Sequence, residues 1–94
     1  GGGLAANLAR ALPDDRDARI DPSTWDVPAV FKFLQEHGRV NDEEMWRVFN
    51  MGIGYCLVVR PDFVGSVTRQ LEAAGETVYQ IGKINKGNGK VRMT

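Results

Sequence analysis

The chain has 94 residues, of which 43% are hydrophobic, so it is long enough for one small globular domain. Its 12 basic and 12 acidic residues balance, which gives no overall indication of a nucleic-acid or membrane partner. No apolar run approaches the roughly 18 residues of a membrane span. The single cysteine, Cys56, lies in an apolar run, which favours a buried structural thiol and a cytoplasmic protein.

The first third of the chain is predicted to form one helix and a long turn-rich segment. Leucines spaced four residues apart indicate a helix over residues 4–12, and Pro13 ends it. Residues 14–26 are polar and rich in turn-forming side chains. Within this segment, Ile20 and Trp25 are expected to anchor the chain to a core.

Two further helices are predicted before the middle of the chain. The first covers residues 27–37, with Asp26 as its N-cap and Gly38 just beyond its end. The second covers residues 42–49 and has a complete start signal. Asn41 can cap this helix, and a glutamate three residues later fits a capping box.

The second half of the chain is predicted to contain a strand, a helix and another strand. The near-continuous apolar run at residues 53–60 indicates a strand buried on both faces. A helix is expected over residues 61–74, and a second strand over residues 77–84. Strands joined by a helix and short turns are usually parallel, so residues 53–84 are predicted to form a βαβ unit.

The tail completes the predicted fold class. A hairpin-like turn is expected at residues 87–89, with Val91 and Met93 in a short edge strand. The class is α/β, with α+β as the alternative: an incomplete two-layer domain with helices packed on a small mixed sheet. Because the chain starts inside an apparently structured segment, it is expected to be a fragment. An unpaired sheet edge would then make the isolated chain self-associate.

Most familiar catalytic motifs are missing from this sequence. One histidine and one cysteine, far apart, do not make a zinc-type ligand set, and no metal site is predicted. His37 at a helix end is expected to meet terminal carbonyls rather than to act in catalysis. No Gly-Lys-Ser/Thr phosphate loop occurs. The basic tail lacks interleaved aromatic residues, so a solvated edge is favoured over an RNA-binding surface.

Two glycine-containing stretches remain as candidate binding features. The triple glycine at residues 1–3 precedes a helix, where exposed backbone N–H groups can hold an anion such as phosphate. A frayed terminus or a cloning remnant explains it equally well. At Asn50, the side-chain amide both donates and accepts, while Gly52 and Gly54 keep the adjacent surface open. The alternative is a helix C-cap at Asn50 followed by a turn into the strand.

Four stretches, in order along the chain, resemble those of a known family. They are GGGL followed by N-L and LP, then VPAVFKFLQEHG, EEMWRVFNMGIGYCLVV and VYQIGKI. Their order and spacing resemble the C-terminal part of phosphoribosylformylglycinamidine cyclo-ligases, also called aminoimidazole ribonucleotide synthetases. On this resemblance, residues 1–94 are part of that C-terminal domain, and the ATP-binding N-terminal domain is absent.

The resemblance implies an enzyme of de novo purine synthesis. Such enzymes use ATP to cyclise formylglycinamidine ribonucleotide to aminoimidazole ribonucleotide. It further implies that ATP and Mg²⁺ bind mainly to the N-terminal domain, that the full enzyme is a homodimer, and that this chain alone is inactive, with no assignable catalytic residue. The matching positions, which are expected to face the ribonucleotide substrate, are Gly1, Gly2, Gly3, Asn50, Gly52 and Gly54.

Two other functions stay open as alternatives. One is a related ATP-using enzyme of the same superfamily, of the thiamine-monophosphate kinase or selenophosphate synthetase type. The pattern over residues 24–50 favours the purine enzyme over these. The other is a non-catalytic binding or assembly module, as in a multifunctional purine protein. An upstream ATP-binding domain in the full reading frame would favour the enzyme.

Overall fold

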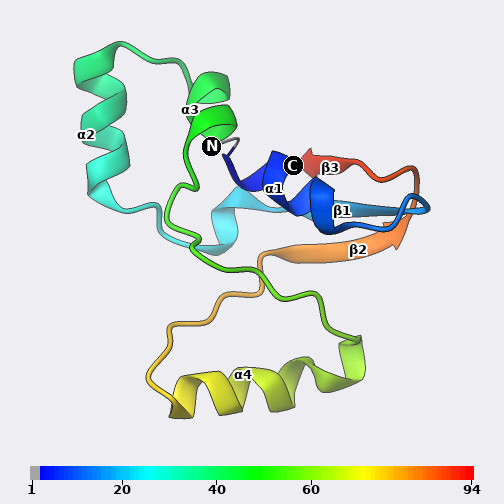
Figure 1. Ribbon diagram of the computed structural model, residues 1–94. Helices are drawn as coiled ribbons and strands as arrows, with labels where there is room; N and C mark the ends of the chain where they lie inside the picture. The colour runs from blue at the N-terminus through cyan, green and yellow to red at the C-terminus, as the bar shows by residue number, and fades with distance from the viewer. Residues whose placement is uncertain (1–2) are drawn as a thin grey trace.

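The computed structural model describes residues 3–94 and shows four α-helices around a three-stranded mixed sheet (Figure 1). Three of the helices lie in the first half of the chain, and the fourth precedes the last two strands. Two short 3-10 turns complete the fold. In chain order the elements are α1 (Gly3–Ala11), β1 (Arg16–Ile20), η1 (Pro22–Thr24), α2 (Ala29–Gly38), α3 (Asp42–Val48), η2 (Pro61–Phe63), α4 (Val64–Ala73), β2 (Gly82–Lys86) and β3 (Val91–Met93).

The sheet has β1 in its centre, in the order β2-β1-β3. β2 runs antiparallel to β1 and β3 runs parallel to it. Ala18 of β1 faces Ile84 on one side and Val91 on the other. Alternation along a strand turns Ala18 and Ile20 to the same face, and both are buried. That face carries the core.

Helix α1 supplies the other half of the core. Leu4 and Leu8 are buried against Ala18, Ile20 and Trp25. Helix α3 packs beside α1, and the ring of Trp46 on α3 meets the ring of Trp25 edge-on, at 5.7 Å between centroids. This edge-to-face geometry is the favoured one for aromatic pairs.

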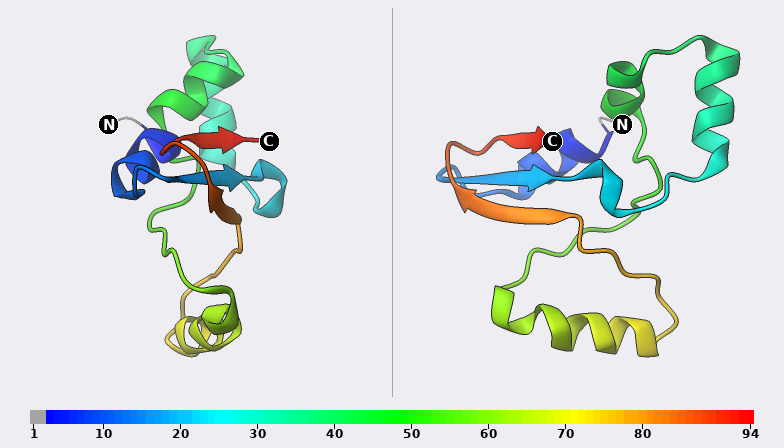
Figure 2. Two further views of the ribbon diagram at one scale, coloured as in Figure 1. Left: turned by 90° about the vertical axis from the view of Figure 1, so that its right-hand side faces the viewer. Right: turned by 180° about the vertical axis from the view of Figure 1, so that it is seen from behind.

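Helices α2 and α4 contribute no buried residue to the core. Both stand away from the sheet, α2 beyond α3 and α4 on the other side of the molecule (Figures 1 and 2). Within the described part of the chain, no helix is long and apolar enough to cross a membrane.

The predicted helices are confirmed, with small shifts at their ends. Asn41 caps α3 as expected, because its Oδ1 accepts from the backbone N–H of Glu44 at 2.8 Å. The glutamate side chain, however, pairs with Arg47 rather than reaching back to the cap. Helix α2 starts two residues later than predicted, because Pro28 has extended ψ and takes the N-cap position in place of Asp26.

The predicted βαβ unit over residues 53–84 is wrong, although the α/β class with a small mixed sheet is confirmed. Residues 53–60 are not a strand, since no described segment pairs with them. The second strand was predicted over residues 77–84, whereas the observed strand covers residues 82–86. This strand pairs antiparallel with β1. The segment 14–26, predicted as turns, thus contains the central strand.

The tail also differs from the expected hairpin. Val91 and Met93 do form an edge strand, as predicted. This strand does not pair with β2, because β1 lies between them. Cys56 is half-buried rather than fully buried, and burial raises the pKa of its thiol, which keeps it protonated and unreactive at neutral pH.

Candidate functional site

Two adjoining hollows, of about 330 and 350 Å³, lie beside the start of α1. Both are lined by Gly3, Asn7 and Asn50. The first hollow also has an apolar wall from α2 and the end of α3. The second is bounded by the inner side of α1 and by the chain from Ile53 to Cys56. The start of α1 and the chain from Asn50 to Cys56 therefore meet at one place.

Gly3 allows α1 to begin in close contact with the end of α3. Its φ of +67° is a left-handed conformation, which glycine adopts without strain. A Cβ here would overlap the carbonyl oxygen of Trp46 and lie 2.9 Å from that of Arg47. The start of α1 thus faces the carbonyl end of α3, a favourable arrangement of helix dipoles. Gly1 and Gly2, also predicted to bind substrate, lie outside the described residues.

Asn7 is a lining residue that the sequence reasoning missed. Its Nδ2 donates to the carbonyl oxygen of Gly3 at 2.7 Å, and its Oδ1 accepts from Arg10 at 3.0 Å. The carboxamide therefore joins the first turn of α1 to a guanidinium at the next turn. No local signal marks this residue, because only the approach of the distant corner at Asn50 makes it part of the lining.

Asn50 shapes the corner that closes the hollows. Its Oδ1 accepts from the backbone N–H of Gly52 at 2.9 Å, as in an Asx turn. The helix C-cap itself is Phe49, so Asn50 is the first residue of the corner and not the cap. Among residues 3–94, its Nδ2 has no hydrogen-bond partner, and this donor is available to a ligand.

The corner is anchored to the core through its second residue. Met51 has a φ of +54° and is buried. Its carbonyl oxygen accepts from the indole N–H of Trp25 at 3.1 Å. Because Trp25 also packs in the core beneath α1, the corner is held rigidly against the helix that forms the other wall.

The two glycines of the corner have different surroundings. Gly54 lines the second hollow, and a Cβ placed on it would meet no atom within 4 Å. Gly52 lines neither hollow. Its φ is +102°, and a Cβ there would overlap Pro28 Cδ. The structure thus brings Gly3, Asn50 and Gly54 together and assigns Gly52 to the turn that supports them.

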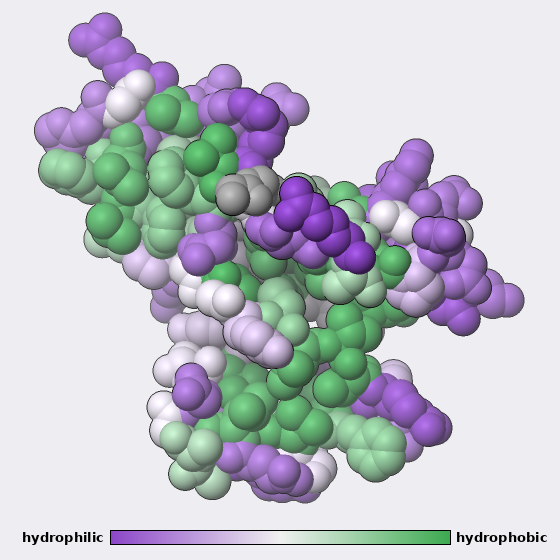
Figure 3. Space-filling view, in the orientation of Figure 1, coloured by the Kyte–Doolittle hydropathy of each residue, from purple (hydrophilic) through white to green (hydrophobic). Residues whose placement is uncertain are grey.

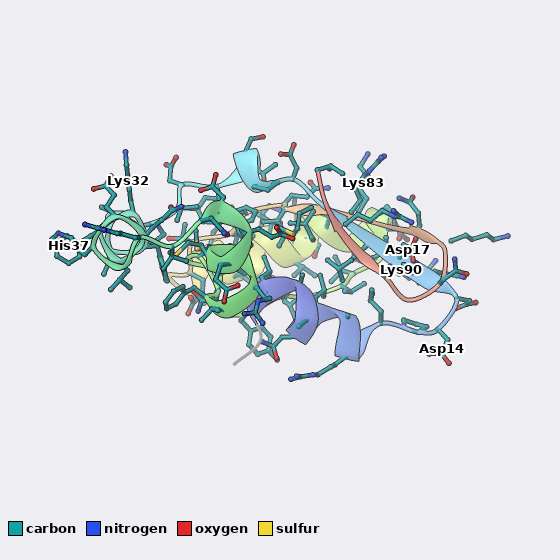
Figure 4. All side chains as sticks on the ribbon, turned by 90° about the horizontal axis from the view of Figure 1, so that it is seen from above. Asp14, Asp17, Lys32, His37, Lys83 and Lys90 are labelled. Carbon is teal, nitrogen blue, oxygen red and sulfur yellow. The ribbon has the colours of Figure 1, made fainter. Side chains whose placement is uncertain are left out.

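Charged groups are sparse around the hollows. The guanidinium of Arg10, held by Asn7, is the charged group tied most directly to the lining residues. His37 lies in the last turn of α2, where its ring stacks on Phe33 at 4.1 Å between centroids. Figure 4 shows it near Lys32, at the opposite end of the molecule from Asp14 and Asp17. Residues 3–94 include no group of three or more His, Cys, Asp or Glu that could hold a metal ion.

Comparison with protein families identifies the chain. Residues 1–94 match the family of the AIR synthase related protein, C-terminal domain. The chain belongs to this family. Curated relatives are 43–48% identical to this chain over most of its length.

Three of these relatives illustrate the range of sequence identity and coverage. A phosphoribosylformylglycinamidine cyclo-ligase of Bacillus velezensis is 48% identical over 89 residues, which cover 95% of this chain. One from Chromobacterium violaceum is 43% identical over 94 residues. A bifunctional purine biosynthetic protein purD of Dictyostelium discoideum is 45% identical over 84 residues, or 10% of its own length. The chain spans about a quarter of the two cyclo-ligases, 26% and 27% respectively.

Proposed function

We propose that this chain supplies the substrate-facing wall of an ATP-dependent cyclo-ligase that converts formylglycinamidine ribonucleotide to aminoimidazole ribonucleotide. The observation that carries the proposal is the meeting of Gly3, Asn7, Asn50 and Gly54 around adjoining hollows. These residues come from two motifs that are about 45 positions apart in the chain. Relatives that are 43–48% identical to this chain carry the cyclo-ligase name, which supports the same conclusion.

The proposed reaction has two steps. The γ-phosphoryl group of ATP passes to the formyl oxygen of the substrate, and ADP leaves. An amidine nitrogen then attacks the activated carbon, the imidazole ring closes, and phosphate leaves with its former oxygen while the ring nitrogen gives up a proton. Transfer of this kind depends on positioning and on neutralising charge rather than on a covalent contribution from the protein.

The described residues contribute binding and orientation to this reaction. The Nδ2 group of Asn50 can donate to the ribonucleotide, and the open surface at Gly54 lets the ligand approach the backbone. Arg10 adds a positive charge near an anionic substrate. The described residues do not fit Mg²⁺, since residues 3–94 hold no group of three or more acidic, His or Cys side chains placed to bind a metal ion.

Several properties of the whole protein follow from the same proposal. ATP and Mg²⁺ would be bound mainly by an N-terminal domain, and the whole enzyme would be a cytoplasmic homodimer. The 94 residues alone would be inactive, because ATP would be bound mainly by that N-terminal domain. The kinase and synthetase alternatives are not favoured, since the cyclo-ligase name recurs among the relatives.

The test uses the complete enzyme and a matched pair of isosteric substitutions. Asn50→Asp keeps the oxygen that accepts from Gly52 but removes the donor and adds negative charge beside an anionic substrate. We expect the KM for the ribonucleotide to rise by roughly tenfold or more, with a smaller change in kcat. Asn85→Asp, on the exposed surface of β2, is the control and should leave both constants unchanged.

Two outcomes would contradict the proposal. If the complete enzyme does not form aminoimidazole ribonucleotide from formylglycinamidine ribonucleotide and ATP, the function is wrong. If it does, but Asn50→Asp and Asn85→Asp behave alike in a folded enzyme, the function holds and the site is misplaced. Folding of each variant is checked by its circular dichroism spectrum and its thermal transition.

A further inference from the structure

The second hollow runs along the length of α1. Its lining includes Gly3, Asn7 and Ala11, which lie four residues apart on one face of the helix. At about 1.5 Å per residue, this stripe is roughly 12 Å long. Gly3 and Asn7 line both hollows, whereas Ala11 lines the second alone. The Gly3 end and the Ala11 end of the second hollow can therefore hold different parts of one ligand.

A positively charged side chain, that of Arg10, borders the Ala11 end. Arg10 is in the last turn of α1, seven residues after Gly3, and this spacing places it on the same helix face as the stripe. Its side chain is exposed, and its Nη1 donates to Oδ1 of Asn7 at 3.0 Å. The guanidinium is thus one hydrogen bond away from a side chain that lines the hollow.

Asn7 fixes the direction in which this guanidinium is held. Its Nδ2 donates to the carbonyl oxygen of Gly3 at 2.7 Å, so the amide cannot turn over without losing that bond. Its Oδ1 is therefore directed toward Arg10. Among residues 3–94, no other side-chain hydrogen bond or ion pair engages the guanidinium, and its remaining N–H groups are available to a ligand.

No acidic side chain neutralises this charge within the described part of the chain. The arginines that form ion pairs there are Arg16, Arg47, Arg60 and Arg92. Neither hollow has an acidic residue in its lining. Figure 3 shows hydrophilic side chains over α1 in the middle of the face, with apolar surface toward α3 and toward α4. A guanidinium without a counter-ion favours an anion, and its planar fork of donors suits a phosphate.

The Gly3 end of the hollow suits an anion less well. The carbonyl oxygens of Trp46 and Arg47, at the end of α3, lie against Gly3. Carbonyl groups at the C-terminus of a helix carry partial negative charge, which disfavours a phosphate beside them. Asn50, which also lines this end, offers the neutral donor Nδ2 instead. The charge distribution therefore differs between the two ends.

We propose that Arg10, positioned by Asn7, binds the 5′-phosphate of the ribonucleotide and so sets the direction in which the substrate lies. This inference rests on the proposed function. The phosphate lies at the Ala11 end of the second hollow, and the formylglycinamidine part lies at the Gly3 end, within reach of Asn50. Arg10 thereby distinguishes the ribonucleotide from a ribonucleoside, which lacks the phosphate.

The kinetic test uses the complete enzyme. Arg10→Gln removes the charge and should raise the KM for the ribonucleotide by about tenfold or more, with little change in kcat. Arg10→Lys keeps the charge but not the planar fork, and should recover part of the loss. The matched control is Arg19→Gln, an equal loss of charge at an exposed position of β1 that lines neither hollow. It should leave the KM unchanged.

A binding test identifies the group that Arg10 contacts. Isothermal titration of the complete enzyme with ribose 5-phosphate and with ribose should show a preference for the phosphate, and Arg10→Gln should reduce this preference by about tenfold. Asn7→Ala should also weaken the binding of ribose 5-phosphate. This effect should be much smaller when Arg10 is already glutamine, because the two side chains act as one unit.

Four outcomes would overturn the inference. They are an Arg10→Gln enzyme with the wild-type KM, an Arg19→Gln effect as large as that of Arg10→Gln, a wild-type enzyme that binds ribose as tightly as ribose 5-phosphate, and an Asn7→Ala effect that is equal with and without Arg10. Each would leave the proposed function intact if the wild-type enzyme still forms aminoimidazole ribonucleotide. A wild-type enzyme without turnover would refute the proposed function instead, and the titrations would still test Arg10. Circular dichroism establishes that each variant is folded.

Discussion

Substitution of the two glycines of the corner by alanine is expected to affect the stability of the fold differently. Gly52→Ala places a methyl group on a residue whose φ is +102°, and that methyl would overlap Pro28 Cδ. The conformational strain costs about 1–2 kcal/mol. Overpacking against a rigid proline ring adds about 1–3 kcal/mol. We therefore expect a loss of roughly 2–5 kcal/mol, which is a large part of the stability of a small domain.

Gly54→Ala is the matched comparison two residues further along the same turn. Its φ is outside the left-handed region, and an added Cβ meets no atom within 4 Å. The substitution should be neutral, or stabilise by about 0.4–1 kcal/mol because alanine restricts the unfolded chain. Urea denaturation followed by circular dichroism measures both variants. Equal losses at the two positions would refute the assignment of Gly52 to the turn and of Gly54 to open space.

Two further substitutions test other parts of the fold. Trp25→Phe keeps an aromatic ring but leaves the carbonyl of Met51 without its donor, and urea denaturation should show a loss of about 1–3 kcal/mol. The pKa of Asp17 is lowered because its carboxylate accepts from backbone N–H groups of the β2–β3 connection (Figure 4). The stability it provides is present above its ordinary pKa near 3.8 and is lost as pH falls through the lower folded value. Asp17→Asn should therefore reduce the difference in urea midpoint between pH 7 and pH 3, whereas Asp14→Asn, at an exposed carboxylate in the preceding turn, should not.

Local signals in the sequence predicted the helices well. Asn41 caps α3 as its spacing from Glu44 indicates, and the leucines of α1 reach the core that their four-residue spacing predicts. Gly75 ends the helical region as expected, with a φ of +92°. These features depend on residues within one or two turns of each other, so a single sequence contains the information.

The sheet depends on contacts that no local pattern reveals. β1 is a five-residue segment, RDARI, in which only Ala18 and Ile20 are buried, so its alternation is too short to distinguish it from a turn. Its antiparallel partner, β2, is more than 60 residues away. The apolar run at residues 53–60 gave a stronger strand signal, yet a strand requires a neighbour, and residues 3–94 offer it none.

The candidate site was predicted only in part, again because local patterns do not reveal contacts between distant residues. Asn50 and Gly54 stood out because glycine and amide residues interrupt an apolar run, and the structure places both beside Gly3. Asn7 did not stand out, because an asparagine within a helix has no distinctive local pattern. Its importance follows only from its two hydrogen bonds and from the approach of a distant corner.

The proposed site and the segment without backbone hydrogen bonds that follows it meet at Gly54. Before it, the chain is held to the core through Met51 and Trp25, and the backbone N–H of Ile53 donates to Asn50 at 3.1 Å. After it, the backbone has no hydrogen-bond partner among residues 3–94 until the carbonyl of Arg60. Tyr55 belongs to both regions, since it lines the second hollow and lies in the segment without backbone hydrogen bonds. The wall of the second hollow therefore joins a segment that is anchored to the core with a segment that makes no backbone hydrogen bond among residues 3–94.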